Sequence, residues 1–167
     1  MVHLSEDKND GLIYDLEVSP LRGYFYSRWQ TNALWVDQEQ YLMSFAYKWA
    51  SEKEIHYLDL RDTATFLLDP TADRELVRAL FELWQHSGWV MGYNGDRFDN
   101  KMAKTFFVRN GFVCNKKMSI DPLKIVKKEF RFSANSMKNV AIELGVEEKM
   151  EVSLGNITRR IIEHRRS

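Results

Sequence analysis

The chain has 167 residues, of which 44% are hydrophobic and 13% aromatic, a composition that is globular and excludes a disordered chain. Its formal net charge is zero, so a nucleic-acid partner would have to be bound by a local basic patch and not by overall basicity. Cys114 is the only cysteine, which excludes an intrachain disulfide and a CxxC zinc site.

Residues 1–10 form a polar leader that lacks the apolar stretch of a signal peptide. No apolar run further along the chain approaches the length of a transmembrane helix. We therefore expect a single domain after the leader, no membrane association and a reducing, cytoplasmic setting.

The first third of the chain has the composition of β-strands. Residues 11–17 predict a short buried strand, which Ser19-Pro20 ends. Aromatic and β-branched residues then predict two further strands with a turn around 37–40, and 55–60 predicts another. Consecutive strands of this kind favour a meander of antiparallel neighbours.

The spacing of apolar residues then changes to that of a helix. Asp73 begins a predicted helix that ends at Gly88, and residues 89–92 predict a short buried strand. Further helices are predicted at 98–109, at 121–129, and from Ser133 or Asn135 to 144–145. Strands followed by strand–helix alternation predict an α/β fold, a mixed β-sheet flanked by helices.

Three carboxylates stand at the ends of these elements. Asp15 and Glu17 are two residues apart on a strand, so their side chains project from the same face. Asp99 opens a helix directly after the strand at 89–92. Such acids are costly to bury unless a cation compensates them, and carboxylate oxygens suit Mg²⁺ or Mn²⁺. The alternative is a solvated strand end and a simple helix cap.

The order of these acids resembles that of the DEDD superfamily of 3′–5′ exonucleases. Residues 14–20 resemble its first motif, whose Asp-x-Glu donates two metal ligands, and residues 92–99 resemble its second, which supplies a third ligand Asp. Residues 42–49, 119–124 and 133–145 are similar to segments of bacterial and phage-type members. The resemblance covers residues 11–149 and implies a ribonuclease-H-like fold, followed by an atypical basic tail at 150–167.

The resemblance implies a metal-dependent exonuclease that acts on a single-stranded 3′ end of DNA or RNA. Asp15, Glu17 and Asp99 would then hold two Mg²⁺ or Mn²⁺ ions. The chain departs from the family pattern because no aspartate follows Asp121, so the fourth ligand of the third motif is not visible. Asp121 precedes a proline and is interpreted as a helix cap, and Glu163 in the tail is the alternative fourth acid.

The missing ligand leaves two other functions open. The first is a catalytically degenerate or truncated module that binds nucleic acid or a protein partner. The second is a ribonuclease-H-like endonuclease, which uses a similar set of acids. Fold-level likeness alone does not choose among these functions.

Residues that would bind nucleic acid are predicted outside the acids. Asn94 belongs to the second motif, and Lys124, Lys127 and Lys128 are candidate phosphate contacts, with a solvated helix face as the alternative. The aromatic residues of 24–35 are expected in the core, with base stacking as the alternative. Asp96 is expected in a loop. No role is predicted for the three histidines that lack partners at metal-ligand spacing, which are His3, His56 and His86.

Overall fold

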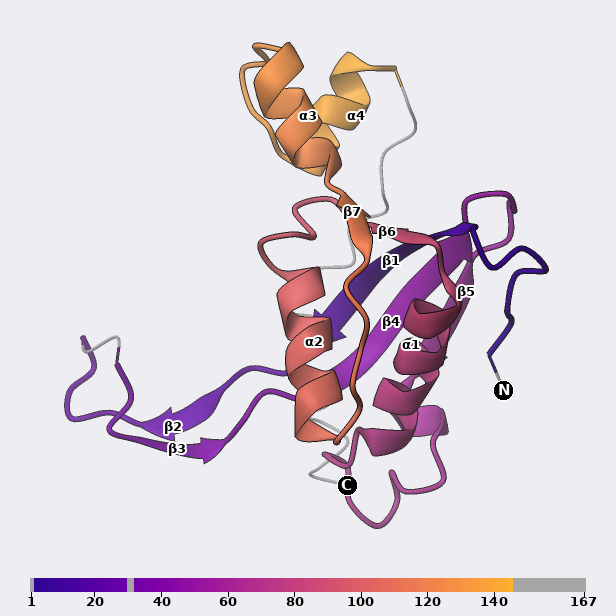
Figure 1. Cartoon of the computed structure of the whole chain (residues 1–167). Coiled ribbons are helices and arrows are strands. Elements are labelled where there is room, and N and C mark those ends of the chain that lie inside the picture. Colours follow the sequence, from indigo (N-terminus) through magenta and orange to yellow (C-terminus); the bar gives the residue numbers. More distant parts are fainter. Residues whose placement is uncertain (1, 30–31, 146–167) are drawn as a thin grey trace. The chain divides into compact units, whose positions relative to one another are not determined.

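The computed structural model describes residues 2–29 and 32–145 (Figure 1). They belong to two compact units, residues 1–125 and 126–167, and each is described by itself. No helix among the described residues is both long and apolar enough to cross a bilayer. The predicted boundary between 149 and 150, and the basic tail beyond it, lie outside the described residues.

The first unit is built on a five-stranded mixed sheet in the order β5-β4-β1-β6-β7. The central strand β1 (Gly11–Val18) is antiparallel to β4 (Leu42–Trp49) and parallel to β6 (Trp89–Met91). On the two edges, β5 (His56–Asp59) is antiparallel to β4, and β7 (Met118–Ile120) is parallel to β6. The predicted mixed sheet and its antiparallel first strands are therefore confirmed, and β7 was not predicted.

Alternation along β1 and β4 divides the sheet into a core face and an opposite face. The helices α1 (Arg74–His86) and α2 (Asp99–Arg109) pack against each other, and α1 packs on β4 (Figure 1). Both helices were predicted, α1 from apolar side chains that recur at helical spacing and α2 from the Asn110-Gly111 pair that ends it. The side chains on the core face of β1 and β4 are at most 5% exposed: Leu12, Tyr14, Leu16, Phe45, Tyr47 and Trp49. The side chains between them on β1, which include both predicted acids, are half-buried.

A separate two-stranded sheet interrupts the meander. It consists of β2 (Arg22–Tyr24) and β3 (Trp35–Gln38), joined by an ion pair of 2.6 Å between Arg22 and Asp37. The turn predicted at 37–40 is therefore wrong, since the chain reverses between β2 and β3. Strand propensity marks residues that suit a sheet but not where the chain turns.

The aromatic side chains of this β2–β3 hairpin are exposed to solvent. Tyr26 is 85% exposed, Trp29 88% and Trp35 66%, so the expectation that they belong to the core is wrong. The hairpin pairs only with itself, and no second layer covers these side chains among the described residues. Exposed aromatic side chains gathered on one short element are typical of an interaction surface.

The polar leader is hydrogen-bonded to the sheet. The Asp10 carboxylate accepts hydrogen bonds from the Ser5 hydroxyl, the Gly11 amide and the Ser51 hydroxyl, the last at 2.6 Å. A ring nitrogen of His86 lies 2.7 Å from the Ser5 carbonyl oxygen. These contacts hold the leader in place, although its sequence is polar and has no strand or helix pattern.

The second unit begins within α3 (Pro122–Glu129) and contains α4 (Met137–Glu143). The predicted bounds of α3 are confirmed. The helix predicted to start at Ser133 or Asn135 has Ser136 as its N-cap, because the Ser136 hydroxyl accepts a hydrogen bond of 3.2 Å from the Asn139 amide.

Candidate functional site

The three predicted acids lie where β1 passes the start of α2. Asp15 and Glu17 lie on the half-buried face of β1. Asp99 is the first residue of α2 and is only 5% exposed. Its Oδ1 accepts a hydrogen bond of 3.2 Å from the amide of Leu16. Because Leu16 stands between Asp15 and Glu17, this bond brings the Asp99 carboxyl to the segment of β1 that carries the other two acids.

The pKa of Asp99 depends on the charges of the other two acids. The pKa of Asp99 is raised to about 6, first because the carboxyl is buried and then because the charges of Asp15 and Glu17 repel its ionised form. The hydrogen bond from the Leu16 amide acts in the opposite direction. A divalent cation would relieve this repulsion, and the all-carboxylate donor set fits Mg²⁺ or Mn²⁺.

The three carboxylates do not form a closed ligand cage. Among the described residues, they are not a group whose ligand atoms all lie within 4.8 Å of one another. Oxygen ligands around Mg²⁺ are about 3 Å apart, since each lies about 2.1 Å from the ion. Like charges without a cation repel, so the side chains would have to move closer together when an ion binds.

A tight loop places Asp99 beside β1. A Cβ atom on Gly92 would lie 3.2 Å from the Tyr14 carbonyl oxygen, and one on Gly95 would lie 2.9 Å from the Gly92 carbonyl oxygen. Asn94 has a φ of 61°, a left-handed conformation that asparagine tolerates better than most residues. The loop from β6 to α2 therefore favours glycine, which has no Cβ atom, at 92 and 95. Nucleic-acid binding by the Asn94 side chain stays a prediction.

Asp121 fixes the same loop and caps α3. Its Oδ1 accepts hydrogen bonds from the amide of Leu123 at 3.0 Å and from the amide of Asn94 at 2.9 Å. The interpretation of Asp121 as a cap is confirmed. Its carboxylate is buried and engaged by backbone amides, so it is poorly suited to be the fourth ligand.

A buried polar network behind the acids was not predicted. The Tyr14 hydroxyl donates to Asn100 Oδ1 at 2.6 Å, and Asn100 Nδ2 donates to Asp96 Oδ1 at 2.9 Å and to Ser119 Oγ at 2.8 Å. Burial of the Tyr14 ring, with the charges of Asp99 and Asp96, raises the pKa of its hydroxyl well above the usual value. The network ties β1, α2 and β7 together next to Asp99. The sequence gives only one local sign of this network, which is that a polar residue, Asn100, directly follows Asp99.

Lys124 completes this network through Asp96. The Lys124 ammonium forms an ion pair with the Asp96 carboxylate, and this bond, with the Ser119 hydroxyl, lowers the pKa of Asp96. Asp96 does lie in the loop before α2, as predicted. The ion pair competes with the predicted phosphate contact of Lys124. Lys127 and Lys128 are exposed on α3, where Lys128 lies 2.9 Å from the Glu129 carboxylate.

Asp59 shares a sheet face with Glu17, since Ser44 pairs with both residues. Arg61 engages both Asp59 oxygens, at 2.8 and 2.6 Å. Although burial would raise the pKa of Asp59, these hydrogen bonds hold it below its ordinary value. The Asp59 carboxylate is therefore occupied by Arg61. The alternative fourth acid, Glu163, lies outside the described residues.

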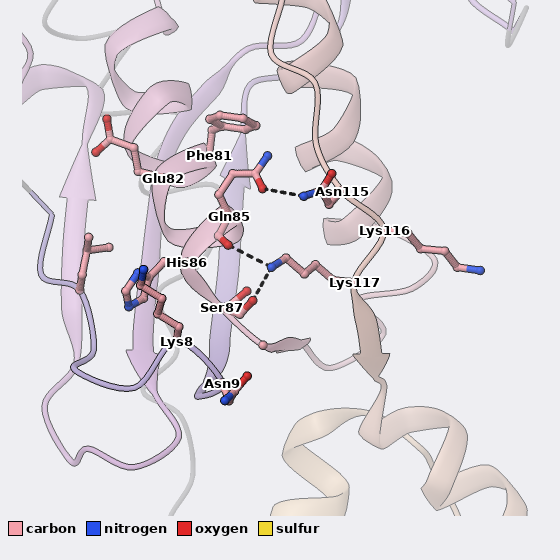
Figure 2. A pocket seen from close by; sticks show the side chains of 12 residues that line it. Lys8, Asn9, Phe81, Glu82, Gln85, His86, Ser87, Asn115, Lys116 and Lys117 are labelled. Carbon is pink, nitrogen blue, oxygen red and sulfur yellow. Dashed lines mark hydrogen bonds between the residues drawn. The ribbon is translucent and has the colours of Figure 1, made fainter.

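A surface hollow lies at the other end of β1 (Figure 2). Its lining includes Lys8, Lys116 and Lys117, but the Lys117 ammonium donates to the carbonyl oxygens of Gln85, at 3.0 Å, and Ser87. Burial lowers the pKa of this ammonium. Lys117 therefore binds carbonyl oxygens at the end of α1, and the hollow is not part of the acidic site.

Two of the three histidines for which the sequence predicts no role lie close to each other and to a glutamate. His3, Glu52 and His56 place one ligand atom each within 4.8 Å of one another. The prediction that His3 and His56 have no metal-ligand partners is wrong, because these partners are distant in the sequence. His86 instead contacts the leader and packs edge-on against Trp49.

A family model described as the RNase_H superfamily matches residues 13–158, a span that includes all three acids. No relative was found among curated proteins. The mixed five-stranded sheet flanked by helices agrees with this match. The chain therefore belongs to the ribonuclease H superfamily, whose members are generally hydrolytic nucleases that act on nucleic acid.

Proposed function

We propose that this chain carries the metal-binding core of a 3′–5′ exonuclease that acts on single-stranded ends of DNA or RNA. The observation that supports it best is the hydrogen bond from Leu16 to Asp99, which joins the acid of α2 to the two acids of β1. The order of these acids in the chain is that of the DEDD exonucleases, which favours this reaction over others on the same fold.

In this proposal Asp15, Glu17 and Asp99 would hold Mg²⁺ or Mn²⁺, which would supply activation of the attacking water and stabilisation of the leaving 3′-oxygen. The chain itself orients the acids. The Leu16 amide fixes one oxygen of Asp99, and Asp99 must release its proton before it can act as a ligand.

We expect the isolated chain to be inactive or a very weak nuclease. Asp121, Asp96 and Asp59 each have another partner in the structure, which makes these three poorly suited to be the fourth ligand. A fourth carboxylate offsets the repulsion between two cations, and a misplaced water alone costs about a hundredfold in rate. The measurement is nucleotide release from 3′- and 5′-labelled single strands with Mn²⁺.

Two variants would identify the acids on which any measured nuclease activity depends. Loss of 3′ degradation in Glu163→Gln would identify Glu163 as the fourth acid. Robust degradation that survives Glu163→Gln but vanishes in Asp99→Asn would show that three acids suffice, contrary to our expectation. Cleavage of a circular single strand would indicate an endonuclease in place of an exonuclease.

The second candidate function is a non-catalytic module that binds nucleic acid or a protein partner. The exposed aromatic side chains of the β2–β3 hairpin favour it, because bases stack on such side chains without sequence preference. Binding of a single strand by a chain that binds no Mn²⁺ at the three acids would favour this function over the exonuclease.

Binding to single strands is expected to depend on Lys127 and Lys128 more than on Lys124, because Lys124 is paired with the half-buried Asp96, whereas the partner of Lys128 is the exposed Glu129 of its own helix. Lys127→Ala with Lys128→Ala should weaken binding at low salt and reduce the slope of log affinity against log salt by about 1.4, for two lost phosphate contacts. The measurement is a salt series of fluorescence anisotropy titrations. Lys53→Ala, an exposed lysine before β5, is the control. An unchanged slope in the double variant would remove these lysines from the interface.

A further inference from the structure

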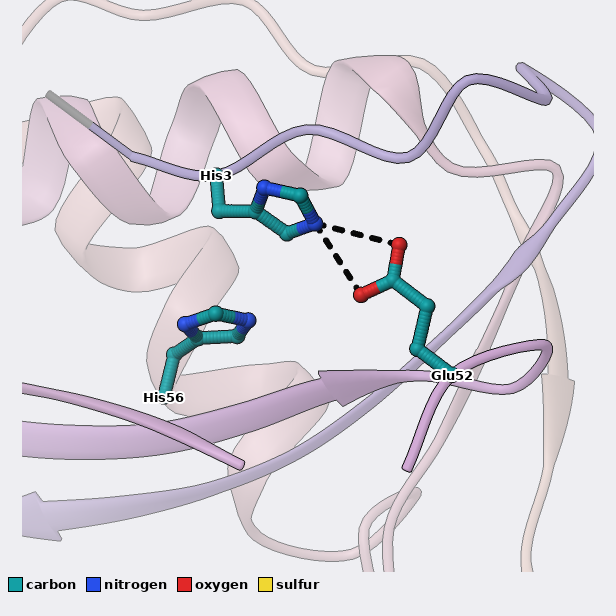
Figure 3. A group of neighbouring side chains, drawn as sticks. All are labelled: His3, Glu52 and His56. Atoms are coloured by element: carbon teal, nitrogen blue, oxygen red, sulfur yellow. Dashed lines mark hydrogen bonds and ion pairs between the residues drawn. The ribbon is translucent and has the colours of Figure 1, made fainter. Parts of the chain in front are cut away.

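We propose that His3, Glu52 and His56 bind a divalent transition metal of the zinc type, at a site separate from the three acids. The three residues come from different segments: His3 from the leader, Glu52 from the connection after β4, and His56 from the first position of β5 (Figure 3). Their ligand atoms all lie within 4.8 Å of one another.

Glu52 and His3 already form one side of such a site. His3 Nε2 lies 3.0 Å from each Glu52 carboxylate oxygen. The backbone of His3 is fixed as well, because its amide donates to the Tyr47 hydroxyl at 3.0 Å and its carbonyl accepts from Trp49 Nε1 at 3.1 Å. The position of His3 is therefore set by the sheet.

His56 supplies the second observation that points to a ligand. Its Nε2 is buried and has no hydrogen-bond partner among the described residues, and buried polar atoms of this kind are rare in proteins. The ring lies between those of His3 and Tyr47, with centroids 4.9 Å from each. Figure 3 shows the ring edge far from the His56 backbone turned toward the His3–Glu52 pair. A metal ion there would give this nitrogen a partner.

The donor set indicates which metals fit. Two imidazoles and one carboxylate suit Zn²⁺ or Co²⁺, whereas Mg²⁺ prefers oxygen ligands alone. Tetrahedral zinc with bonds of about 2.1 Å needs donor atoms about 3.4 Å apart, so donor atoms that lie within 4.8 Å of one another have to close by at most about 1.4 Å. The His3 side chain is 48% exposed and the Glu52 side chain 29%, which leaves both room to move. Three protein ligands leave a fourth position for water.

The site lies at the opposite end of β1 from the acids. Glu52 follows Trp49, which pairs with Leu12 near the start of β1, whereas Ser44 pairs with Glu17 near its end. An ion held there would tie the leader to β4 and β5. It would therefore act on the stability of the leader and not on the attacking water of the acidic site.

The test uses the full chain with Asp15→Asn as the background, so that the acidic site is disabled. Zn²⁺ calorimetry and the visible absorption of bound Co²⁺ should show one site, retained in excess Mg²⁺. Adding Glu52→Gln or His56→Phe should each lower the Zn²⁺ affinity about a hundredfold. Glu52→Gln keeps the hydrogen bond to His3, and His56→Phe keeps the stacked ring, so both should fold.

Thermal unfolding gives a second readout. Zn²⁺ at about 100 times its dissociation constant should raise the Tm of the background protein by about 5 °C or more, and that of the Glu52→Gln variant at the same Zn²⁺ concentration by only about 1 °C. Absence of any bound Zn²⁺ in the background protein, or an affinity unchanged by both substitutions, would overturn the proposal. Since neither readout involves nucleic acid, failure here leaves the exonuclease proposal untouched.

Discussion

Asp15→Asn is expected to lower the affinity of the chain for Mn²⁺ by about a hundredfold or more. Loss of a residue that merely supports a metal ligand already costs about 10–100-fold, and Asp15 is proposed to be a ligand itself. Its carboxylate acts electrostatically on Asp99, so its removal also weakens the field that attracts the cation. The substitution keeps the size of the side chain, removes its charge and replaces one acceptor oxygen by an amide donor.

Calorimetry with MnCl₂ measures this affinity in the wild-type chain and in the variant. Asp62→Asn is the matched control, because it makes the same change at an exposed position of the 3₁₀ helix η1 (Leu60–Asp62). The control should bind as the wild type does. Equal affinities of the wild type and Asp15→Asn would mean that Mn²⁺ binds elsewhere, and the assignment of the acids would then be wrong.

Asp99→Asn is expected to stabilise the metal-free chain, by about 1–3 kcal/mol at pH 7.5. The folded pKa of about 6 lies above the ordinary value for the unfolded chain, so the folded state holds more protons between about pH 4 and pH 6. Stability contributed by protonated Asp99 is therefore lost as the pH rises through this window. Asparagine cannot ionise, and its Oδ1 can still accept the hydrogen bond from Leu16.

Urea unfolding in EDTA at pH 4.5 and pH 7.5 measures the difference. Wild type should lose stability between the two values relative to Asp99→Asn, and the gap between the proteins should open as the pH rises. Added Mn²⁺ should then stabilise the wild type and not the variant. A variant that is less stable than the wild type at pH 7.5 in EDTA would show that burial and the neighbouring charges do not destabilise the ionised Asp99 carboxylate.

The parts of the site that were predictable depend on short sequence separations. Period-two alternation places Asp15 and Glu17 on one face of a strand, and a polar residue after a short buried strand places Asp99 at a helix start. The Asp121 cap was predictable for the same reason, because Pro122 follows it. None of these inferences requires knowledge of which strands are neighbours.

The parts that were not predictable depend on contacts between distant segments. Tyr14 and Asn100 are 86 residues apart, and nothing in either local sequence indicates that they meet. His3 and Glu52 are 49 residues apart, so a search for ligand spacing within one motif misses them. The strand β7 contains a serine and is exposed or half-buried throughout, so it lacks the apolar run that predicts the equally short β6.

Four of the five tryptophans of the chain fall into two optical classes, and the fifth, Trp89, is half-buried. Trp29 and Trp35 are in contact with water, whereas Trp49 and Trp84 are enclosed in the core. Indoles in water emit at longer wavelength and are open to soluble quenchers, whereas enclosed indoles are shielded. The intrinsic fluorescence of the unlabelled chain thus carries two separate signals: a quenchable one that reports what touches the hairpin, and a protected one that reports whether the sheet and its helices are intact.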